Sequence, residues 1–220
     1  MIEKEQLLPT RCVESDAPAI VAFANDVAGG ATDDVARAIH LYRAVRDGIV
    51  YDPYDRFANP QSCSALRALE RGRGYCIPKA ALLVAAARSL GIPGRLGFAD
   101  VRNHLASRRL IEANNGSVFR WHCYAELHLD GRWVKATPAF DSDLCRRVRI
   151  EPLEFDGRHD SVFHAFDSGR KHMEYVRDRG HYDGVPHEDI LATLRSESPA
   201  LLEEAYFAGA RAFVDEVQVH

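Results

Sequence analysis

Two residues of the chain, Cys76 and His122, have the side chains that thiol-based acyl chemistry requires. Such chemistry needs a thiol that can lose its proton, an imidazole that carries the proton, and a third group that orients the imidazole. Gly74 and Pro78 flank Cys76 and suit the exposed start of a helix. We therefore take Cys76 as the candidate nucleophile and His122 as the candidate base.

The helix that carries Cys76 is expected to end before Gly91, which suits the position after a last helical turn. The apolar run from Ala80 to Ala87 offers no polar face, so this helix should be buried on nearly all sides. Cys76 would then lie at its N-terminal end, where free backbone N–H groups and the helix dipole favour a thiolate. The sequence thus predicts a cysteine with a lowered pKa.

His122 lies in the segment 118–129, where apolar and polar residues alternate as they do in a β-strand. The dipeptide Asp130-Gly131 follows and predicts a two-residue type I′ turn into a second strand. In the register of that turn Glu126 lies opposite Lys135, and we expect these two residues to form an ion pair. His122 would therefore stand on the polar face of a β-hairpin.

Two residues of the second strand are candidates for the group that orients His122. Thr137 and Asp141 are its diagonal neighbours on the same face, provided that the strand continues past Pro138. A carboxylate stabilises an imidazolium by its charge, whereas a hydroxyl only accepts a hydrogen bond. We favour Asp141 for its charge and keep Thr137 as the alternative.

Three blocks of the sequence resemble the transglutaminase-like superfamily of papain-related cysteine enzymes. They are RGYC with the helix and GIPGR after it (residues 73–95), WHCYAELHLDGRW (121–133) and VKATPAFD (134–141). The family pattern has a Cys at a helix start, a His followed by an aromatic residue and Glu on a strand, and Asp-Pro on the next strand. This chain has Thr137-Pro138 in place of Asp-Pro, so Thr137 holds the family position.

The resemblance implies an α+β fold with a papain/transglutaminase-like core, in which the nucleophile helix packs on an antiparallel β-sheet, with extra C-terminal helices. It implies a single transglutaminase-like domain over residues 1–220, with a core at about 31–141 and an extension at about 142–220. The implied oxyanion hole uses the backbone N–H of Cys76, and Tyr51 is a candidate second donor.

The implied activity is that of a cysteine hydrolase or acyltransferase, which attacks an amide, ester or thioester carbonyl through a Cys acyl-enzyme and needs no cofactor or metal. Its partner would be a peptide, amide or acyl small-molecule substrate. Transfer from a carrier thioester, as in the arylamine acetyltransferases, uses the same order of nucleophile, histidine and acid. Because Thr137 replaces an acid, a catalytically weak or inactive binding module is the alternative.

Composition and charge exclude several other classes of protein. The 220 residues include 28 Lys+Arg and 32 Asp+Glu, and a net charge of −4 argues against a nucleic-acid-binding surface. No apolar run approaches the roughly 20 residues that span a bilayer. The N-terminal MIEKEQLLPT does not resemble a signal peptide, so we expect a cytoplasmic protein. Five cysteines without a C-x-x-C pair predict neither a disulfide framework nor a zinc site.

Other elements are expected to frame the site. Thr32 should cap a helix that runs to about Arg46, because an apolar stripe follows it. Residues 95–101 predict a strand, and residues 104–116 predict a polar excursion. Near the C-terminus Val185-Pro186 opens one helix, and Ser198-Pro199 opens a last one with Ser198 as its cap.

Overall fold

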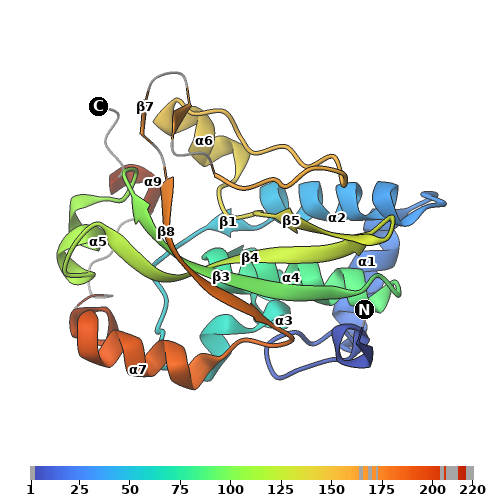
Figure 1. The fold of residues 1–220 in the computed structure, drawn as a ribbon, viewed down its shortest axis with the longest axis horizontal. Coiled ribbons are helices and arrows are strands. Elements are labelled where there is room, and N and C mark those ends of the chain that lie inside the picture. Colours follow the sequence, from blue (N-terminus) through green and yellow to red (C-terminus); the bar gives the residue numbers. More distant parts are fainter. Residues whose placement is uncertain are drawn as a thin grey trace.

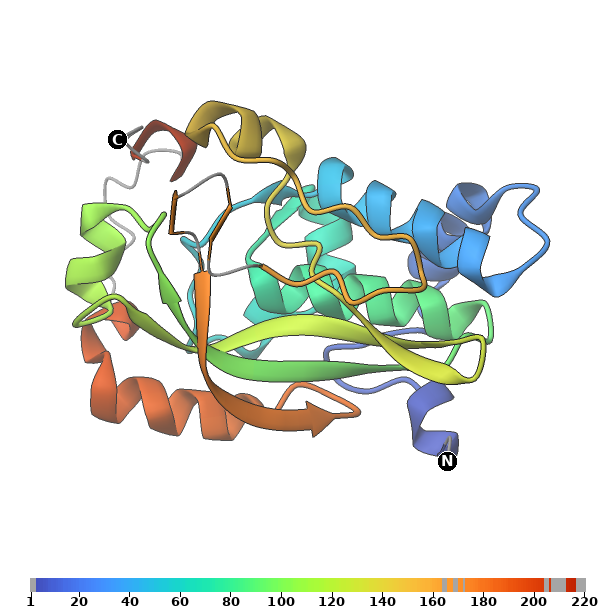
Figure 2. The same ribbon diagram turned by 45° about the horizontal axis from the view of Figure 1, so that its top comes forward.

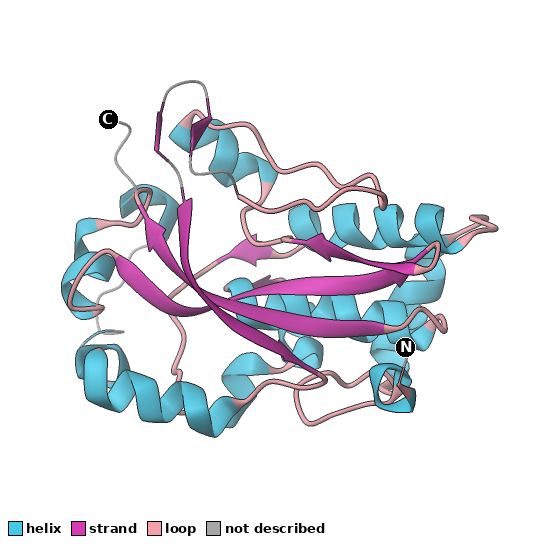
Figure 3. Cartoon of the chain, in the orientation of Figure 1, coloured by secondary structure: helices cyan, strands magenta, loops and turns pink. Residues whose placement is uncertain are grey.

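The centre of the molecule is a four-stranded antiparallel sheet with the strand order β5-β4-β3-β8 (Figure 1). The strands are β3 (Gly94–Asn103), β4 (Val118–Leu129), β5 (Arg132–Ala136) and β8 (Met173–Tyr182). This is a computed structural model that describes residues 3–163, 166–167, 170–171, 173–203, 206 and 213–216. Helices lie behind the sheet and at its ends in this view (Figure 3), so the fold is α+β, as predicted.

Helix α4 (Cys76–Ser89) forms the core and packs against β4, with α1, α2 and α3 around it. Every residue from Ile77 to Arg88 is buried. Small alanine side chains let the helix approach the sheet closely, and its apolar surface is removed from water on all sides. The predicted buried helix that starts at Cys76 is therefore confirmed.

The β4–β5 hairpin has the predicted register, with Glu126 opposite Lys135. Asp130 and Gly131 both have positive φ angles, 48° and 82°, as a type I′ turn requires. The expected Glu126–Lys135 ion pair is wrong. Glu126 is also opposite Arg95 of β3 and accepts a hydrogen bond from its Nε at 2.5 Å, because the planar guanidinium reaches a carboxylate across the central strands.

Two helices differ from the sequence prediction. Helix α2 (Asp34–Gly48) is capped by Asp33, whose carboxylate accepts the N–H of Ala36 at 2.9 Å, so Thr32 is not the cap. The expected polar excursion contains α5 (Arg108–Ala113), which is capped by Ser107. A helix of six residues is too short to produce a recognisable apolar stripe.

The C-terminal part of the chain adds a strand that the sequence analysis did not predict. Strand β8 pairs with β3 along most of its length. Helix α7 (His187–Glu197) begins directly after Pro186, as predicted, and lies at the opposite end of the molecule from α1 and α2 (Figure 2). Ser198 does not cap the next helix, because its hydroxyl donates to the carbonyl of Asn114 at 2.8 Å.

The remaining elements are shorter or lie at the periphery: η1 (Lys4–Leu7), α1 (Pro18–Ala28), β1 (Val50–Tyr51), η2 (Pro60–Cys63), α3 (Ala65–Arg71), β2 (Arg73–Gly74), α6 (Ser142–Val148), β6 (Phe166–Asp167), β7 (Arg170–Lys171), η3 (Pro199–Leu202) and α9 (Phe213–Glu216). Within the described ranges, no helix combines the length and the hydropathy needed to cross a membrane.

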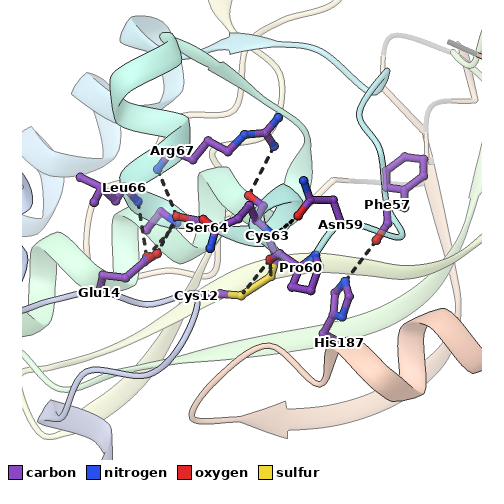
Figure 4. Close-up of a disulfide and its surroundings, with 12 residues drawn as sticks. Cys12, Glu14, Phe57, Asn59, Pro60, Cys63, Ser64, Leu66, Arg67 and His187 are labelled. Atoms are coloured by element: carbon purple, nitrogen blue, oxygen red, sulfur yellow. Dashed lines mark hydrogen bonds between the residues drawn. A yellow bond between two sulfur atoms is a disulfide. The ribbon is translucent and has the colours of Figure 1, made fainter.

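Cys12 and Cys63 form a disulfide, which the sequence analysis did not expect (Figure 4). It joins the N-terminal segment to η2, and Glu14 next to it accepts hydrogen bonds from the Ser64 hydroxyl at 2.5 Å and the Ala65 N–H at 3.0 Å. The two cysteines are 51 residues apart, so no local spacing marks them as a pair. Cys76, Cys123 and Cys145 are free.

Candidate active site

Cys76 and His122 line the same cavity, which lies beside the N-terminal end of α4 and is bordered by β4 and α7. The cavity has a volume of about 100 Å³. Cys76 is the first residue of α4 and is only partly buried, so its thiol borders this space. His122 comes from β4 and is 6% exposed. The fold thus brings the predicted nucleophile and base from separate layers to one place.

The thiol of Cys76 has a raised pKa, contrary to the prediction. Burial raises its pKa to about 11, although the backbone N–H groups of Cys123, Ile77 and Cys76 itself act to lower it. The helix-start position was predicted correctly, but the loss of hydration outweighs the N–H dipoles around the sulfur. At neutral pH the side chain of Cys76 is therefore the neutral thiol.

The imidazole of His122 is also neutral, because burial lowers its pKa to about 4. Its ring centroid lies 6.2 Å from that of Tyr175 and 6.3 Å from that of Phe163, so aromatic rings replace water around it. Among the described residues, nothing pairs with its buried Nε2 atom. A neutral imidazole that shares a cavity with a neutral thiol is in the protonation state that a general base needs.

The lowered pKa of His122 predicts a loss of stability in acid. The unfolded chain takes up a proton on this histidine near pH 6.5, whereas the folded chain takes it up only near pH 4. The free energy of unfolding should therefore fall as the pH is lowered through this interval, by about 3 kcal/mol from this residue alone. Urea denaturation of wild type and His122→Gln at pH 7, 6, 5 and 4 measures the effect, since carboxylate titrations are common to both chains. Parallel curves for the two proteins would contradict it.

Thr137 lies directly after β5 and is 1% exposed. Its backbone is held on both sides, because its N–H donates to the Ser161 carbonyl at 3.0 Å and its carbonyl accepts from the Tyr42 hydroxyl at 3.1 Å. Its buried hydroxyl makes no hydrogen bond of acceptable geometry within the described residues. The ring of Tyr175 contacts His122. Burial raises the pKa of the Tyr175 phenol, and the nearby Thr137 side chain acts to lower it.

Asp141 does not line this cavity, although its neighbour Phe140 does. Strand β5 ends at Ala136, so the strand does not continue to Asp141 and the condition that placed it on the face of His122 is not met. Its Oδ1 accepts the N–H of Leu144 at 2.8 Å and thereby caps α6, and its Oδ2 accepts the N–H of Tyr51 at 2.9 Å. Both carboxylate oxygens thus bind backbone groups.

The residue before His122 has an unusual backbone conformation that the sequence did not reveal. Trp121 has a φ angle of +61°, which is rare for a bulky residue. Asp100 accepts its N–H at 3.2 Å, and Arg179 binds the same carboxylate while its guanidinium lies 4.5 Å from the indole centroid. These contacts fix Trp121 and, through the adjoining peptide, the position of His122. No local sequence pattern marks such a contact between β3, β4 and β8.

Tyr51 also borders the cavity. Burial raises the pKa of its phenol well above the ordinary value, and the nearby Cys76 adds to the effect. The hydroxyl therefore stays protonated and can donate a hydrogen bond. Within the described parts of the chain, no cluster of three or more His, Cys, Asp or Glu residues could hold a metal ion.

Comparison with protein families matches residues 21–138 to the transglutaminase core model, described as the transglutaminase-like superfamily. Among curated protein sequences, none matches the chain.

Several solved structures share part of the fold. A "putative cysteine protease" from Cytophaga hutchinsonii has 20% sequence identity and a TM-score of 0.47, with 60% of this chain and 40% of that chain covered. A "putative protease" from Parabacteroides distasonis has 14% identity and a TM-score of 0.43, with 58% and 24% covered. Red sea bream transglutaminase has 18% identity and a TM-score of 0.36, with 48% and 22% covered. The matches thus span less than half the length of each of these proteins.

Proposed function

Because the chain belongs to the transglutaminase-like superfamily, we propose that it is a cysteine hydrolase or acyltransferase that forms an acyl-enzyme at Cys76. The observation that carries the proposal is the shared cavity, in which a thiol at the start of a buried helix and an imidazole from the sheet border the same space. The substrate is an amide, ester or thioester whose carbonyl carbon the sulfur attacks.

In the first step His122 acts as the base. A thiol with a pKa near 11 is almost entirely protonated at pH 7, so its proton must move to the neutral imidazole as the sulfur attacks. The new S–C bond forms while the carbonyl electron pair moves to oxygen. When the tetrahedral intermediate collapses, His122 returns the proton to the leaving group, and the thioester remains on Cys76.

In the second step water or an amine attacks the thioester carbonyl, and His122 takes its proton. The acyl group leaves as an acid or a new amide, and the sulfur regains its proton from His122. The backbone N–H of Cys76 and the hydroxyl of Tyr51 are suited to stabilise the oxyanion in both steps.

Thr137 is the residue that we assign to orient His122. It holds the family position, and its hydroxyl and the Nε2 atom of His122 are both buried without a hydrogen bond of acceptable geometry among the described residues. Both side chains lie next to Tyr175. A hydroxyl gives the imidazolium no charge stabilisation, so we expect a slower enzyme than one with a Cys-His-Asp triad.

The test is detection of the acyl-enzyme by intact-mass spectrometry at pH 7 after incubation with p-nitrophenyl esters. Wild type and Cys145→Ser should gain the mass of one acyl group, and Cys76→Ser should gain none. Cys145 is a matched control because it is also free and is buried outside the cavity. Adducts that persist in Cys76→Ser would refute the assignment. A wild type that no ester acylates would favour the alternative, a binding module without activity.

A further inference from the structure

A large part of the wall around the cavity comes from a region that the family match does not include. The match ends at residue 138, whereas α7, the residues around it and the start of β8 supply a substantial share of the lining: Met173, Val185, His187, Ile190, Leu194 and Leu201. All of these except His187 are apolar. Part of the cavity wall therefore lies outside the region that the family model describes.

Helix α7 is attached to the residues that position the candidate base. The indole Nε1–H of Trp121 donates to the Thr193 hydroxyl at 2.9 Å. At the start of the helix, Nε2 of His187 hydrogen-bonds the Phe57 carbonyl at 3.1 Å (Figure 4). The apolar wall is thus fixed to both sides of the cavity, next to His122 and next to the loop before η2.

Several of the polar side chains that line the cavity are already bound within the protein, although Nε2 of His122 and Nδ1 of His187 have no hydrogen-bond partner among the described residues. Arg120 forms an ion pair with Glu197, and the Nδ2 group of Asn114 donates to two backbone carbonyls at 2.7 and 2.9 Å. Asn103 accepts the N–H of Leu105 at 2.9 Å. Among the described residues no aspartate or glutamate lines the cavity. A charged substrate group would therefore lose its hydration there, while the Arg120 guanidinium of the lining is already paired with Glu197.

The size of the cavity limits the group that it accepts. An apolar cavity of about 150 Å³ holds benzene, and a single water needs about 10–15 Å³. The volume of about 100 Å³ therefore suits a ring or a short branched chain. We propose that the cavity selects an uncharged apolar group of about this size, and that, given the proposed function, this group is the acyl group that Cys76 receives.

The expected selectivity follows from the area that the acyl group buries. Each buried methylene favours binding about fourfold. An isovaleryl group has three more carbons than acetyl, so its transfer to Cys76 should be faster by up to about 60-fold once the intrinsic reactivity of each ester is divided out. A succinyl group of similar length carries a charge and should react no faster than acetyl.

The experiment measures the rates at which p-nitrophenyl acetate, isovalerate, phenylacetate and succinate acylate Cys76, each relative to its reaction with N-acetylcysteine. Leu194→Trp fills the α7 wall and should reduce the isovaleryl-to-acetyl ratio at least tenfold. Ala192→Trp is the matched control, because it adds the same ring at an exposed position of α7 and should leave the ratio unchanged. Circular dichroism and thermal unfolding confirm that each variant is folded.

A binding measurement separates the inference from the proposed function. Phenylacetamide should bind Cys76→Ser, which cannot form the thioester, in a calorimetric titration, and adding Leu194→Trp should weaken its binding. Succinamate should not bind. Equal acylation by all esters, or fastest acylation by the succinate, would overturn the selectivity and leave the acyl-enzyme standing. Binding of phenylacetamide without acylation by any ester would overturn the acyl-enzyme and leave the apolar site standing, and absence of both would overturn both.

Discussion

Replacement of His122 by Gln is expected to slow the reaction of Cys76 with iodoacetamide at pH 7 by about 10²- to 10⁴-fold. With a thiol pKa of about 11, roughly one thiol in 10⁴ is ionised at this pH. Without an imidazole to take the proton, only that fraction reacts. Mapping of the alkylated peptide by mass spectrometry gives the rate at Cys76 separately from the rates at the buried Cys123 and Cys145.

The pH dependence of the same reaction gives the sharper test. In the wild type the rate should be nearly constant from about pH 5 to about pH 9, because His122 is neutral above its pKa of about 4 and the thiol is protonated below its pKa of about 11. In His122→Gln the rate should rise tenfold per pH unit, and the two proteins should converge between about pH 9 and pH 11. His128→Gln is the matched control, since His128 is also on β4 but does not line the cavity. Identical profiles for wild type and His122→Gln would contradict the assignment of the base.

Elements set by neighbouring residues could be predicted from the sequence. The helix that begins at Cys76 follows from a run of apolar residues between Pro78 and Gly91. The hairpin register follows from Asp130-Gly131, because a type I′ turn fixes which residues face each other. These features placed Cys76 at a helix start and His122 on a strand next to it, and the cavity that joins them agrees with that placement.

Features that depend on distant parts of the chain could not be predicted in this way. The partner of Glu126 is Arg95 and not Lys135, because β3 brings a guanidinium to its other side. The raised pKa of Cys76 depends on how far the surrounding layers exclude water, which no pattern around the cysteine records. The pairing of β8 with β3 could not be predicted from neighbouring residues either. The Asp100–Arg179 pair likewise contacts Trp121 from other strands.

The candidate for the third site residue illustrates the same limit. Asp141 has the charge that the chemistry favours, and an alternating pattern places it on the face of His122 only if β5 continues. The chain instead turns after Ala136. The carboxylate caps α6 and binds the N–H of Tyr51, so it connects two segments that lie 90 residues apart. These two hydrogen bonds give Asp141 a structural role in the resting protein.

Substitution of Asp141 by Ala should accordingly lower the free energy of unfolding by about 3 kcal/mol, since it removes two charge-assisted hydrogen bonds to backbone N–H groups. The loss is compounded at Lys79, because burial lowers the pKa of this lysine to about 7 and Asp141 is the principal group that raises it. Urea denaturation at pH 7 measures the change. Asp143→Ala is the matched control, because its exposed ion pair with Arg146 on the same helix contributes less than about 0.5 kcal/mol.

The rate of alkylation of Cys76 distinguishes a structural Asp141 from a catalytic one. Under conditions where Asp141→Ala is folded, its rate should stay within about threefold of the wild type, because the carboxylate does not border the cavity. Thr137→Val should behave in the opposite way, with stability nearly unchanged and alkylation slowed about tenfold, because the hydroxyl makes no standard hydrogen bond with the described residues in the resting structure. If Asp141→Ala remains as stable as the wild type and slows alkylation a hundredfold, Asp141 and not Thr137 orients His122.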